Sequence, residues 1–310
     1  MTTLLLSLVI VLSWGSWIPI AQSIPGAKQS TRTFYITAGN LVFATVALLA
    51  GGSGGQIGLG WREFWLPLAG GMVWTAGSFC AFRATETIGL ARSAGTWTPL
   101  NIIVAFAFGA VLFSELKGTS AARYAILGGC LVLVLAGVFL IIGSQDTSSA
   151  SSTSGTVTSG RLAPAPPRAH SVGFSYAIGA GILWGGYFVP AQWAHVSSQL
   201  ANFPLGIGMF VAAAALAARD GGIVKLPPRH MSALFAAGLL FGIGSVALLG
   251  LVSRVGTGVG FTIAQLSLLP TAGVGIWIFK VPEPGTPAAK KAVAGILLAG
   301  VSGTIIGAVR

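Results

Sequence analysis

The sequence predicts an all-α integral membrane protein with ten transmembrane helices, and three observations support this fold class. Hydrophobic residues make up 54% of the chain, charged residues only 7%, and the mean hydropathy is +0.85. A soluble domain carries about 25% charged residues. Apolar runs separated by charge, Gly or Pro recur along the 310 residues, and ten spans would leave roughly 110 residues for all connections. A catalytic, nucleotide-binding or receptor domain outside the membrane is therefore excluded.

The apolar runs form two sets of five. The first set covers residues 3–21, 33–51, 64–83, 93–113 and 124–142, and the second covers 173–192, 200–218, 231–252, 258–279 and 289–308. The first run has no basic n-region and continues through Trp14 and Trp17, so we interpret it as a span and not as a signal peptide.

The two sets are joined by a segment in which Ser, Thr, Gly and Pro dominate, residues 143–172. Such a composition cannot bury enough apolar surface to fold. We therefore predict a disordered linker between a first repeat, residues 1–142, and a second repeat, residues 173–310.

A repeated motif indicates that the two sets are related. Trp14-Gly15-Ser16-Trp17-Ile18-Pro19 recurs, with one residue inserted, as Trp184-Gly185-Gly186-Tyr187-Phe188-Val189-Pro190. Because five is an odd number of spans, the second set enters the membrane in the opposite orientation. The sequence thus predicts two five-helix inverted repeats, a plan that places the substrate of a secondary transporter near the midplane.

The basic residues predict the orientation in the membrane. The net charge is +11, but Lys and Arg stand singly between apolar runs, which argues for topology and against a nucleic-acid partner. Of the 17 Lys and Arg, twelve fall on one predicted side, and the other five are Arg62, Lys117, Arg123, Arg254 and Arg310. The positive-inside rule makes the richer side cytoplasmic. We expect a multi-pass protein of the cell membrane with both termini extracytoplasmic.

Cysteine and glycine usage add two further expectations. Cys80 and Cys130 lie far apart inside apolar runs, so we predict no disulfide, no metal site and no cofactor. Glycines four residues apart favour close helix contacts in lipid. These pairs are Gly181 and Gly185, Gly238 and Gly242, Gly256 and Gly260, and Gly303 and Gly307.

Several motifs resemble a known transporter family. Trp74-Thr75-Ala76-Gly77, the stretch from Ile88 to Ser93 and the stretch from Phe108 to Glu115 are similar to the third and fourth spans of the glucose/rhamnose transporter family of the drug/metabolite transporter superfamily. Gly258-Val259, the stretch from Gln265 to Ser267 and Glu283 are similar to its ninth span. The resemblance implies a ten-span carrier that imports a monosaccharide or a similar small polar solute with an ion gradient, although relatives carry ureides.

A sugar offers hydroxyl groups at its edge and C–H groups on its faces, so its site needs aromatic rings together with amides or hydroxyls. The aromatic candidates are Trp14, Trp17, Trp74, Trp97, Trp184 and Tyr187. The polar candidates are Asn40, Ser78, Asn101, Gln192 and Gln265, and Arg92 matches an arginine of the family. The alternative for Asn40 is an interhelical hydrogen bond, worth about 0.6 kcal/mol in membranes. The alternative for Arg92 is a snorkelling anchor.

Coupling and gating have three acidic candidates, which are Glu86, Glu115 and Glu283. They lie near span ends, and the sequence leaves open whether a proton or sodium is the coupling cation. Four prolines also occur at related places of the two halves, Pro19, Pro99, Pro190 and Pro270. Each removes a backbone donor and can free a carbonyl group toward a cavity.

These patterns favour a secondary transporter that imports a small neutral polar solute, with a monosaccharide as the leading substrate. An exporter of the same superfamily and a permease for ureides or other nitrogenous metabolites remain alternatives. A membrane enzyme would need clustered Asp, Glu or His, and the six carboxylates and three histidines are scattered. A channel would need charge rings or a carbonyl filter. The predicted partners are the lipid bilayer, the solute and a coupling cation.

Overall fold

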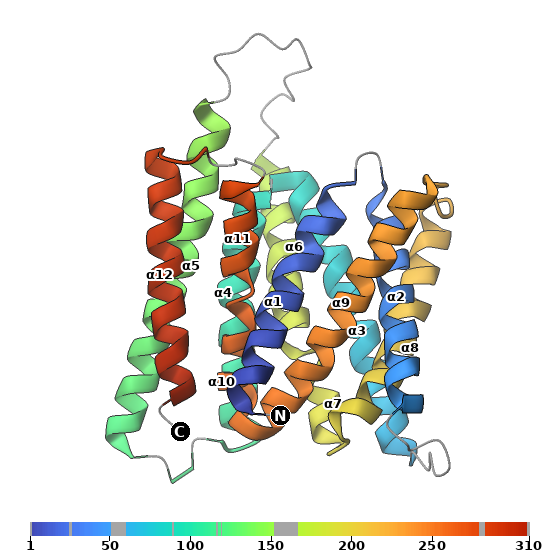
Figure 1. The fold of residues 1–310 in the computed structure, drawn as a ribbon, viewed down its shortest axis with the longest axis horizontal. Coiled ribbons are helices and arrows are strands. Elements are labelled where there is room, and N and C mark those ends of the chain that lie inside the picture. The colour runs from blue at the N-terminus through green and yellow to red at the C-terminus, as the bar shows by residue number, and fades with distance from the viewer. Residues whose placement is uncertain are drawn as a thin grey trace.

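The computed structural model is a bundle of helices (Figure 1). It describes residues 2–24, 27–50, 60–88, 90–115, 117–118, 120–151, 167–278 and 283–308. The helices are α1 (Thr3–Gln22), α2 (Gln29–Ala50), α3 (Trp61–Ile88), α4 (Leu90–Val111), α5 (Ala121–Ser151), α6 (Pro167–Gly186), α7 (Val189–Trp193), α8 (Ser198–Arg219), α9 (Pro228–Val255), α10 (Thr257–Gln265), α11 (Leu268–Trp277) and α12 (Pro287–Ala308).

Six stretches within these residues have both the length and the hydropathy of a membrane span. They are Thr3–Ala21, Gln29–Ala50, Ala121–Ile141, Ser171–Trp193, Leu200–Arg219 and Pro228–Val255. The chain is therefore an α-helical, multi-pass membrane protein, as the sequence predicts.

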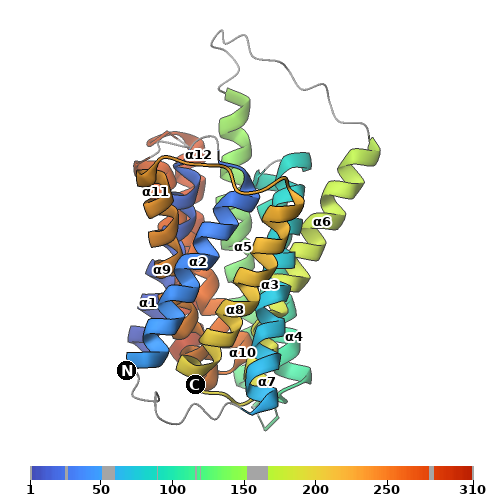
Figure 2. The ribbon, with the colours of Figure 1, turned by 90° about the vertical axis from the view of Figure 1, so that its right-hand side faces the viewer.

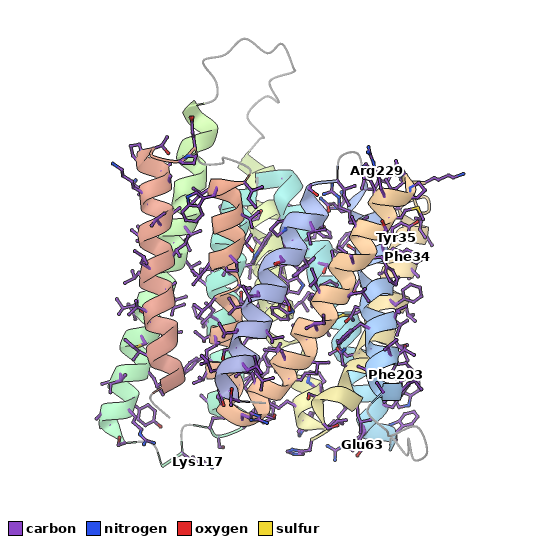
Figure 3. All side chains as sticks on the ribbon, viewed as in Figure 1. Phe34, Tyr35, Glu63, Lys117, Phe203 and Arg229 are labelled. Atoms are coloured by element: carbon purple, nitrogen blue, oxygen red, sulfur yellow. The ribbon has the colours of Figure 1, made fainter. Side chains whose placement is uncertain are left out.

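The bundle has two ends, which Figure 3 marks with labelled side chains. Arg229 lies at one end and Glu63 and Lys117 lie at the other, and we call these the Arg229 end and the Lys117 end. Helix α1 begins and α12 finishes at the Lys117 end, whereas α6 begins at the Arg229 end (Figure 1). The helices that open the two halves of the chain thus run in opposite directions.

Two of the expected spans are broken close to prolines that the sequence analysis singled out. The span expected at 173–192 is divided into α6 and the five-residue α7, and the span expected at 258–279 is divided into α10 and α11. Each break lies just before a proline, Pro190 or Pro270, whose missing N–H and ring prevent a continuous hydrogen-bond ladder. Pro19 and Pro99, in contrast, lie inside unbroken helices.

The helices also extend into the segment expected to be a disordered linker. Helix α5 continues to Ser151 and α6 begins at Pro167, so both ends of residues 143–172 are helical. Each extension prolongs a strongly apolar helix, which supplies the nucleus that a short polar helix lacks. Residues 152–166 lie outside the described part, and the remaining prediction for them is untested.

The bundle packs by close approach of glycines. At the contact between α2 and α9, a Cβ on Gly238 would meet Ile36 O and lie 2.9 Å from the Cα of Gly39. Gly71 on α3 and Gly208 on α8 each face the backbone of the other helix. Gly181 and Gly185 face α4, and Gly242 faces α2, which confirms the prediction from glycine spacing at these positions. Such contacts bring backbones together, so van der Waals packing replaces the hydrophobic drive that lipid cannot supply.

The outer edges differ in character. Helices α5 and α12 pack on each other at one edge (Figure 1), with Gly137 against Gly295. Helix α5 leaves many apolar side chains exposed. Helices α2, α3 and α8 form the opposite edge, which faces the viewer in Figure 2. The core lies between these edges and contains Ile10, Trp14, Trp74, Phe188, Met209, Phe241 and Phe261.

The glycine contacts yield a prediction for stability. We expect Gly238→Ala to lower the thermal unfolding temperature of the purified protein, because the added methyl group must displace the backbone of α2, at a cost of about 1–3 kcal/mol. Gly128→Ala on α5 is the matched control, because its methyl group would enter open space. Equal unfolding temperatures for the two variants in the same detergent would contradict this packing.

Candidate functional site

Six aromatic side chains form one connected cluster where α1, α3, α4, α6 and α9 meet. This aromatic cluster consists of Trp14, Trp17, Trp74, Trp97, Trp184 and Phe241. The indole of Trp14 is stacked on Phe241, with ring centroids 5.6 Å apart and planes 2° from parallel. Phe241 also contacts Trp17 at 5.3 Å and Trp74 at 5.0 Å. The chain of rings continues from Trp74 to Trp184 at 6.5 Å and from Trp184 to Trp97 at 5.5 Å.

The structure therefore brings together five of the six aromatic candidates, and it adds Phe241, which sequence reasoning missed. A sequence signal for Phe241 exists. The stretch from Phe241 to Ser245 repeats the spacing of Trp74 to Ser78, with an aromatic residue followed by Gly and Ser three and four positions later. The hydroxyls of Ser78 and Ser245 donate to the carbonyls of the aromatic residues four positions earlier, at 3.1 and 2.9 Å.

The tryptophans of the repeated motif occupy matching places. The indole edge of Trp184 lies against Gly77 on α3, and that of Trp14 lies against Gly244 on α9. The polar atoms differ, however. Trp184 Nε1 donates to Trp74 O at 3.1 Å, whereas the buried Nε1 of Trp14 has no partner. A buried N–H without a partner costs about 1–3 kcal/mol, so Trp14 has a donor that the protein leaves unused.

Other polar side-chain atoms near the core are also buried without a hydrogen-bond partner. The hydroxyl of Tyr187 is buried without a partner, and so is Oδ1 of Asn40, whose Nδ2 lies 3.5 Å from the sulfur of Met209. Asn202 on α8 is fully buried with neither amide atom paired. The sequence analysis missed Asn202, although an Asn within an apolar run was the same signal that identified Asn40.

The amides of Asn101 and Gln265 have different surroundings. The amide of Asn101 presents one side to two carbonyl oxygens, so we assign its nitrogen to that side, where it donates to Trp97 O at 3.2 Å and to Gly181 O at 2.7 Å and joins α4 to α6. Gln265 is half-buried at the end of α10, beside the break, and its amide makes no hydrogen bond to another described residue. Asn101 thus has the contacts of an interhelical tie, whereas Gln265 has free hydrogen-bonding capacity.

The proline of α1 creates a contact between the two halves of the chain. Pro19 cannot donate to the carbonyl of Gly15, four residues earlier. The hydroxyl of Thr271 on α11 donates to this carbonyl at 2.9 Å. A side chain on Gly15 would collide with Pro270, so the kinked segment between α10 and α11 lies directly on α1.

A second polar cluster lies at the Lys117 end and consists of Glu115, Gln192 and Thr257. The Oε1 atom of Glu115 lies 2.5 Å from the backbone N and 2.6 Å from the hydroxyl oxygen of Thr257, and 3.5 Å from Nε2 of Gln192. The hydroxyl oxygen of Thr257 is also 2.6 Å from Oε1 of Gln192. Gln192 thus lies on α7 with Glu115 and not with the aromatic cluster, which corrects the expectation that it is a midspan residue.

The turn at the start of α10 explains how the carboxylate fits. Gly256 joins α9 to α10 with φ of +83°, a conformation open to Gly. A Cβ at this position would lie 2.6 Å from Oε2 of Glu115. The carboxylate also reaches the backbone N of Gly258 at 3.4 Å, so it caps the positive end of α10. Thr257 was not among the predicted site residues, because nothing in its sequence surroundings shows that Glu115 comes close.

A cavity of about 320 Å³ opens at the Arg229 end between α2, α3 and α8. It is lined by Lys28, Gln29, Ser30, Phe79, Phe82, Arg83, Leu216 and Asp220. Lys28 Nζ donates to the backbone O of Asp220 at 3.2 Å, and the buried hydroxyl of Ser30 has no partner. This end of the bundle is therefore hollowed, whereas the Lys117 end is joined by the Glu115 cluster.

The three remaining acidic and basic candidates are Glu283, Glu86 and Arg92. Glu283 is exposed and follows α11, so it does not lie with Glu115. Glu86 and Arg92 lie on α3 and α4, but their side chains are outside the described part of the structure. Trp61, Trp65, Trp193 and Trp277 are exposed, as expected for an aromatic belt at the membrane surface.

Comparison with known proteins identifies relatives over almost the entire chain. Residues 5–309 match the family model described as "Sugar transport protein". A protein of Bacillus cereus named "Putative sugar uptake protein" is 23% identical over 266 residues, which cover 86% of this chain and 85% of that protein. The "Putative sugar uptake protein YxfA" of Lactococcus lactis is 25% identical over 278 residues and covers 89% and 88% of the two chains.

A solved crystal structure has the same fold. It superposes with a TM-score of 0.66 at 18% identity, over 97% of this chain and 96% of the other. Together with the family match, these relatives confirm the resemblance to a sugar transporter family that the sequence motifs indicated.

The two matched tryptophans provide a test of the hydrogen-bond assignment. We expect Trp184→Phe to lower the stability of the purified protein by about 0.5–1.5 kcal/mol more than Trp14→Phe, because only Trp184 loses a hydrogen bond within the protein. The two changes remove the same atoms, so the difference between their unfolding temperatures isolates that bond. A larger loss for Trp14→Phe would contradict the assignment.

Proposed function

Because the chain belongs to the sugar transport protein family, we propose that it is a secondary transporter for a small neutral polar solute, with a monosaccharide as the leading substrate, and that it works by alternating access. The observation that carries this proposal is the aromatic cluster, in which the Trp14 Nε1 atom is buried without a partner. Rings that cover C–H faces, next to donors and acceptors for hydroxyl groups, match the chemistry of a sugar.

We propose that Trp14, Trp17, Trp74, Trp97, Trp184 and Tyr187 contact the substrate, together with Asn40, Ser78 and Gln265. Gln265 adds a half-buried amide beside a broken helix, a kind of place where transporters build their sites. Asn101 supports this site by fixing α4 to α6, and Arg92 is kept as a candidate from the family resemblance.

We further propose that ten spans form two inverted repeats, in which α7 completes the sixth span and α11 completes the ninth. The pattern of helix contacts supports this arrangement, because it is unchanged when the halves are exchanged. Contact of α3 with α6 corresponds to contact of α9 with α1, and contact of α3 with α8 corresponds to contact of α9 with α2. The pairs α2–α8, α4–α10 and α5–α12 correspond to themselves.

This symmetry supplies a route for alternating access. The Lys117 end is joined by Glu115, Gln192 and Thr257, and the Arg229 end has the cavity next to Ser30 and Arg83. We propose that the Arg229 end is cytoplasmic, since Arg229 belongs to the predicted side that has twelve of the 17 Lys and Arg in the sequence, and that both termini are extracytoplasmic. The structure would then represent a state that is closed to the outside.

A gradient of protons or sodium is proposed to drive uptake. Glu86, Glu115 and Glu283 are the acidic candidates for coupling, and of these Glu115, in the first half of the chain, accepts described hydrogen bonds from Thr257 and Gln192 in the second half. An exporter or a permease for ureides would use the same architecture, so the substrate has to be determined by transport measurements.

Counterflow in proteoliposomes tests the site. We expect the protein to exchange a labelled monosaccharide, and we expect Trp14→Phe and Gln265→Ala to raise the half-saturating sugar concentration about tenfold each, the factor that one lost hydrogen bond of about 1.4 kcal/mol gives. Trp61→Phe, at an exposed ring, is the control and should behave as the unmodified protein.

The same assay decides among the alternatives. A panel of labelled sugars and ureides, measured with the proton gradient collapsed and again without sodium, identifies the substrate class and the driving ion. Exchange of ureides without any sugar would replace the proposed substrate, and unchanged sugar affinity in both variants would remove the aromatic cluster from the binding site.

A further inference from the structure

The cavity at the Arg229 end contains a buried hydroxyl group that the protein leaves unpaired. The cavity has a volume of about 320 Å³ and lies between the start of α2, the last third of α3 and the end of α8. Ser30 lines it and is 1% exposed, and its hydroxyl has no hydrogen-bond partner among the described residues. A buried hydroxyl without a partner is costly, so Ser30 indicates a ligand that brings an acceptor atom.

The start of α2 adds further donors to the same space. This 22-residue helix begins at Gln29, which lines the cavity beside Ser30. The first N–H groups of a helix have no partner within the helix, and they form the positive end of its dipole. Together with a hydroxyl group, such N–H groups are suited to bind the oxygens of a phosphate.

The charged residues that line the cavity leave an excess of positive charge. They are Lys28, Arg83 and Asp220, two cations and one carboxylate. Lys28 Nζ donates to the backbone O of Asp220 at 3.2 Å, which uses one of its three N–H donors. The guanidinium of Arg83 lies over the Phe79 ring, 5.5 Å from the ring centroid, and this contact holds its charge beside the cavity. The lining therefore fits an anion with several acceptor oxygens.

The depth of the cavity matches that of lipid headgroups. The membrane spans Gln29–Ala50 and Leu200–Arg219 begin and end at or next to residues that line it. The phosphate groups of a bilayer lie just outside the hydrocarbon core that such spans cross. Basic pockets between transmembrane helices at this depth are suited to bind phosphorylated headgroups.

An exposed apolar face of α3 connects the cavity with the bilayer interior. Met72 is 42% exposed, Ala76 is also exposed, and Phe79 follows on the same face of the helix. Met72 and Phe79 are seven residues apart, which is about two helical turns. An acyl chain can lie on this face while its headgroup occupies the cavity, so a lipid makes contacts that free phosphate cannot make.

We propose that the cavity binds the phosphate group of an anionic phospholipid. The hydroxyl of Ser30 and the N–H groups at the start of α2 donate to the phosphate oxygens, and Lys28 and Arg83 balance the negative charge. The lipid joins α2, α3 and α8 at one edge of the bundle (Figure 2). The lining residues do not belong to the aromatic cluster, so the inference goes beyond the proposed function and is independent of the transported solute.

Native mass spectrometry of the full chain in detergent tests this site, with dioleoylphosphatidylglycerol as the probe. We expect Ser30→Ala to weaken the tightest lipid binding about tenfold, the factor for one hydrogen bond to a charged group. The unfolding temperature of the lipid-free variant should not fall, because the hydroxyl has no partner among the described residues. We expect Arg83→Gln to weaken binding about fivefold, the effect of one basic residue near an anionic lipid.

Two further variants at the same end serve as controls. Arg229→Gln removes an exposed charge that is not among the lining residues (Figure 3), so its dissociation constant should equal that of the unmodified protein. Asp220→Asn removes the carboxylate from the lining and should tighten binding. The same dissociation constant in Ser30→Ala, Arg83→Gln and the unmodified protein would overturn the proposal.

Alkylation of a single cysteine locates the lipid without a change of charge. Gln29→Cys lies in the cavity lining and Ser232→Cys is exposed at the start of α9, and each is made in a protein with Cys80→Ala and Cys130→Ala. We expect a water-soluble maleimide to modify Gln29→Cys more slowly in phosphatidylglycerol nanodiscs than in phosphatidylcholine nanodiscs, and Ser232→Cys equally fast in both. No slowing at Gln29→Cys, or equal slowing at both positions, would refute a headgroup in the cavity.

Other ligands distinguish the sources of the phosphate group. Phosphatidylcholine and phosphatidylethanolamine carry no net charge and should bind more weakly than phosphatidylglycerol, and equal binding would refute an anionic lipid. Inorganic phosphate should not raise the unfolding temperature of the lipid-free protein at concentrations where phosphatidylglycerol does. Stabilisation by inorganic phosphate that is lost in Ser30→Ala, without a preference for phosphatidylglycerol, would overturn the lipid in favour of free phosphate.

Counterflow separates this inference from the proposed function. Tight phosphatidylglycerol binding that depends on Ser30, in a protein that exchanges no sugar, supports the lipid site and refutes the proposed substrate. Sugar exchange by a protein that binds phosphatidylglycerol and phosphatidylcholine equally supports the transporter and refutes the lipid site.

Discussion

Every backbone polar group of a chain in hydrocarbon needs a partner, and this requirement governs the organisation of the molecule. Helices satisfy their own backbones, but the prolines remove donors and release carbonyl groups. The carbonyl of Gly15, released by Pro19, is paired by the hydroxyl of Thr271 from the other half of the chain. The carbonyl group that one helix leaves unpaired is thus paired by a residue of the other half, and the same contact fixes where α11 lies on α1.

Glycines allow neighbouring helices to pack with their backbones in contact. Gly39 and Gly238, and Gly71 and Gly208, bring α2 to α9 and α3 to α8 with backbone against backbone. The bulky rings are then accommodated by the remaining space between α1, α3, α6 and α9, where Trp14 and Trp184 lie against Gly244 and Gly77. Small residues therefore determine the position of large ones. The matched arrangement leaves one difference, since Trp184 has a hydrogen-bond partner and Trp14 has none.

The two ends of the bundle differ in how closely their helices are joined. At the Lys117 end, the carboxylate of Glu115 accepts hydrogen bonds from elements that are far apart in the sequence, and at the Arg229 end a cavity separates α2, α3 and α8. In the proposed transport cycle, the Lys117 end opens when the Arg229 end closes, and the reverse.

The sequence by itself determined the membrane class, the approximate spans and the aromatic residues of the core. Hydropathy and span length follow from composition along the chain, and they do not depend on how helices pack. The repeated Trp-Gly motif likewise located Trp14 and Trp184, because both halves preserve the same local residues. Prolines at related positions indicated broken helices, but the sequence did not show that α6 and α10 would break whereas α1 and α4 would remain whole.

Only the tertiary structure decided which polar residues meet. Gln192 and Asn101 looked equivalent as amides within apolar runs, yet one joins Glu115 and the other is paired to the carbonyls of Trp97 and Gly181. Phe241 and Thr257 acquired their importance from neighbours more than a hundred residues away in the sequence, Trp14 and Glu115. The local sequence shows which chemical groups a residue offers. Which residue it contacts depends on how the helices cross, and that depends on the close contacts of the complete bundle.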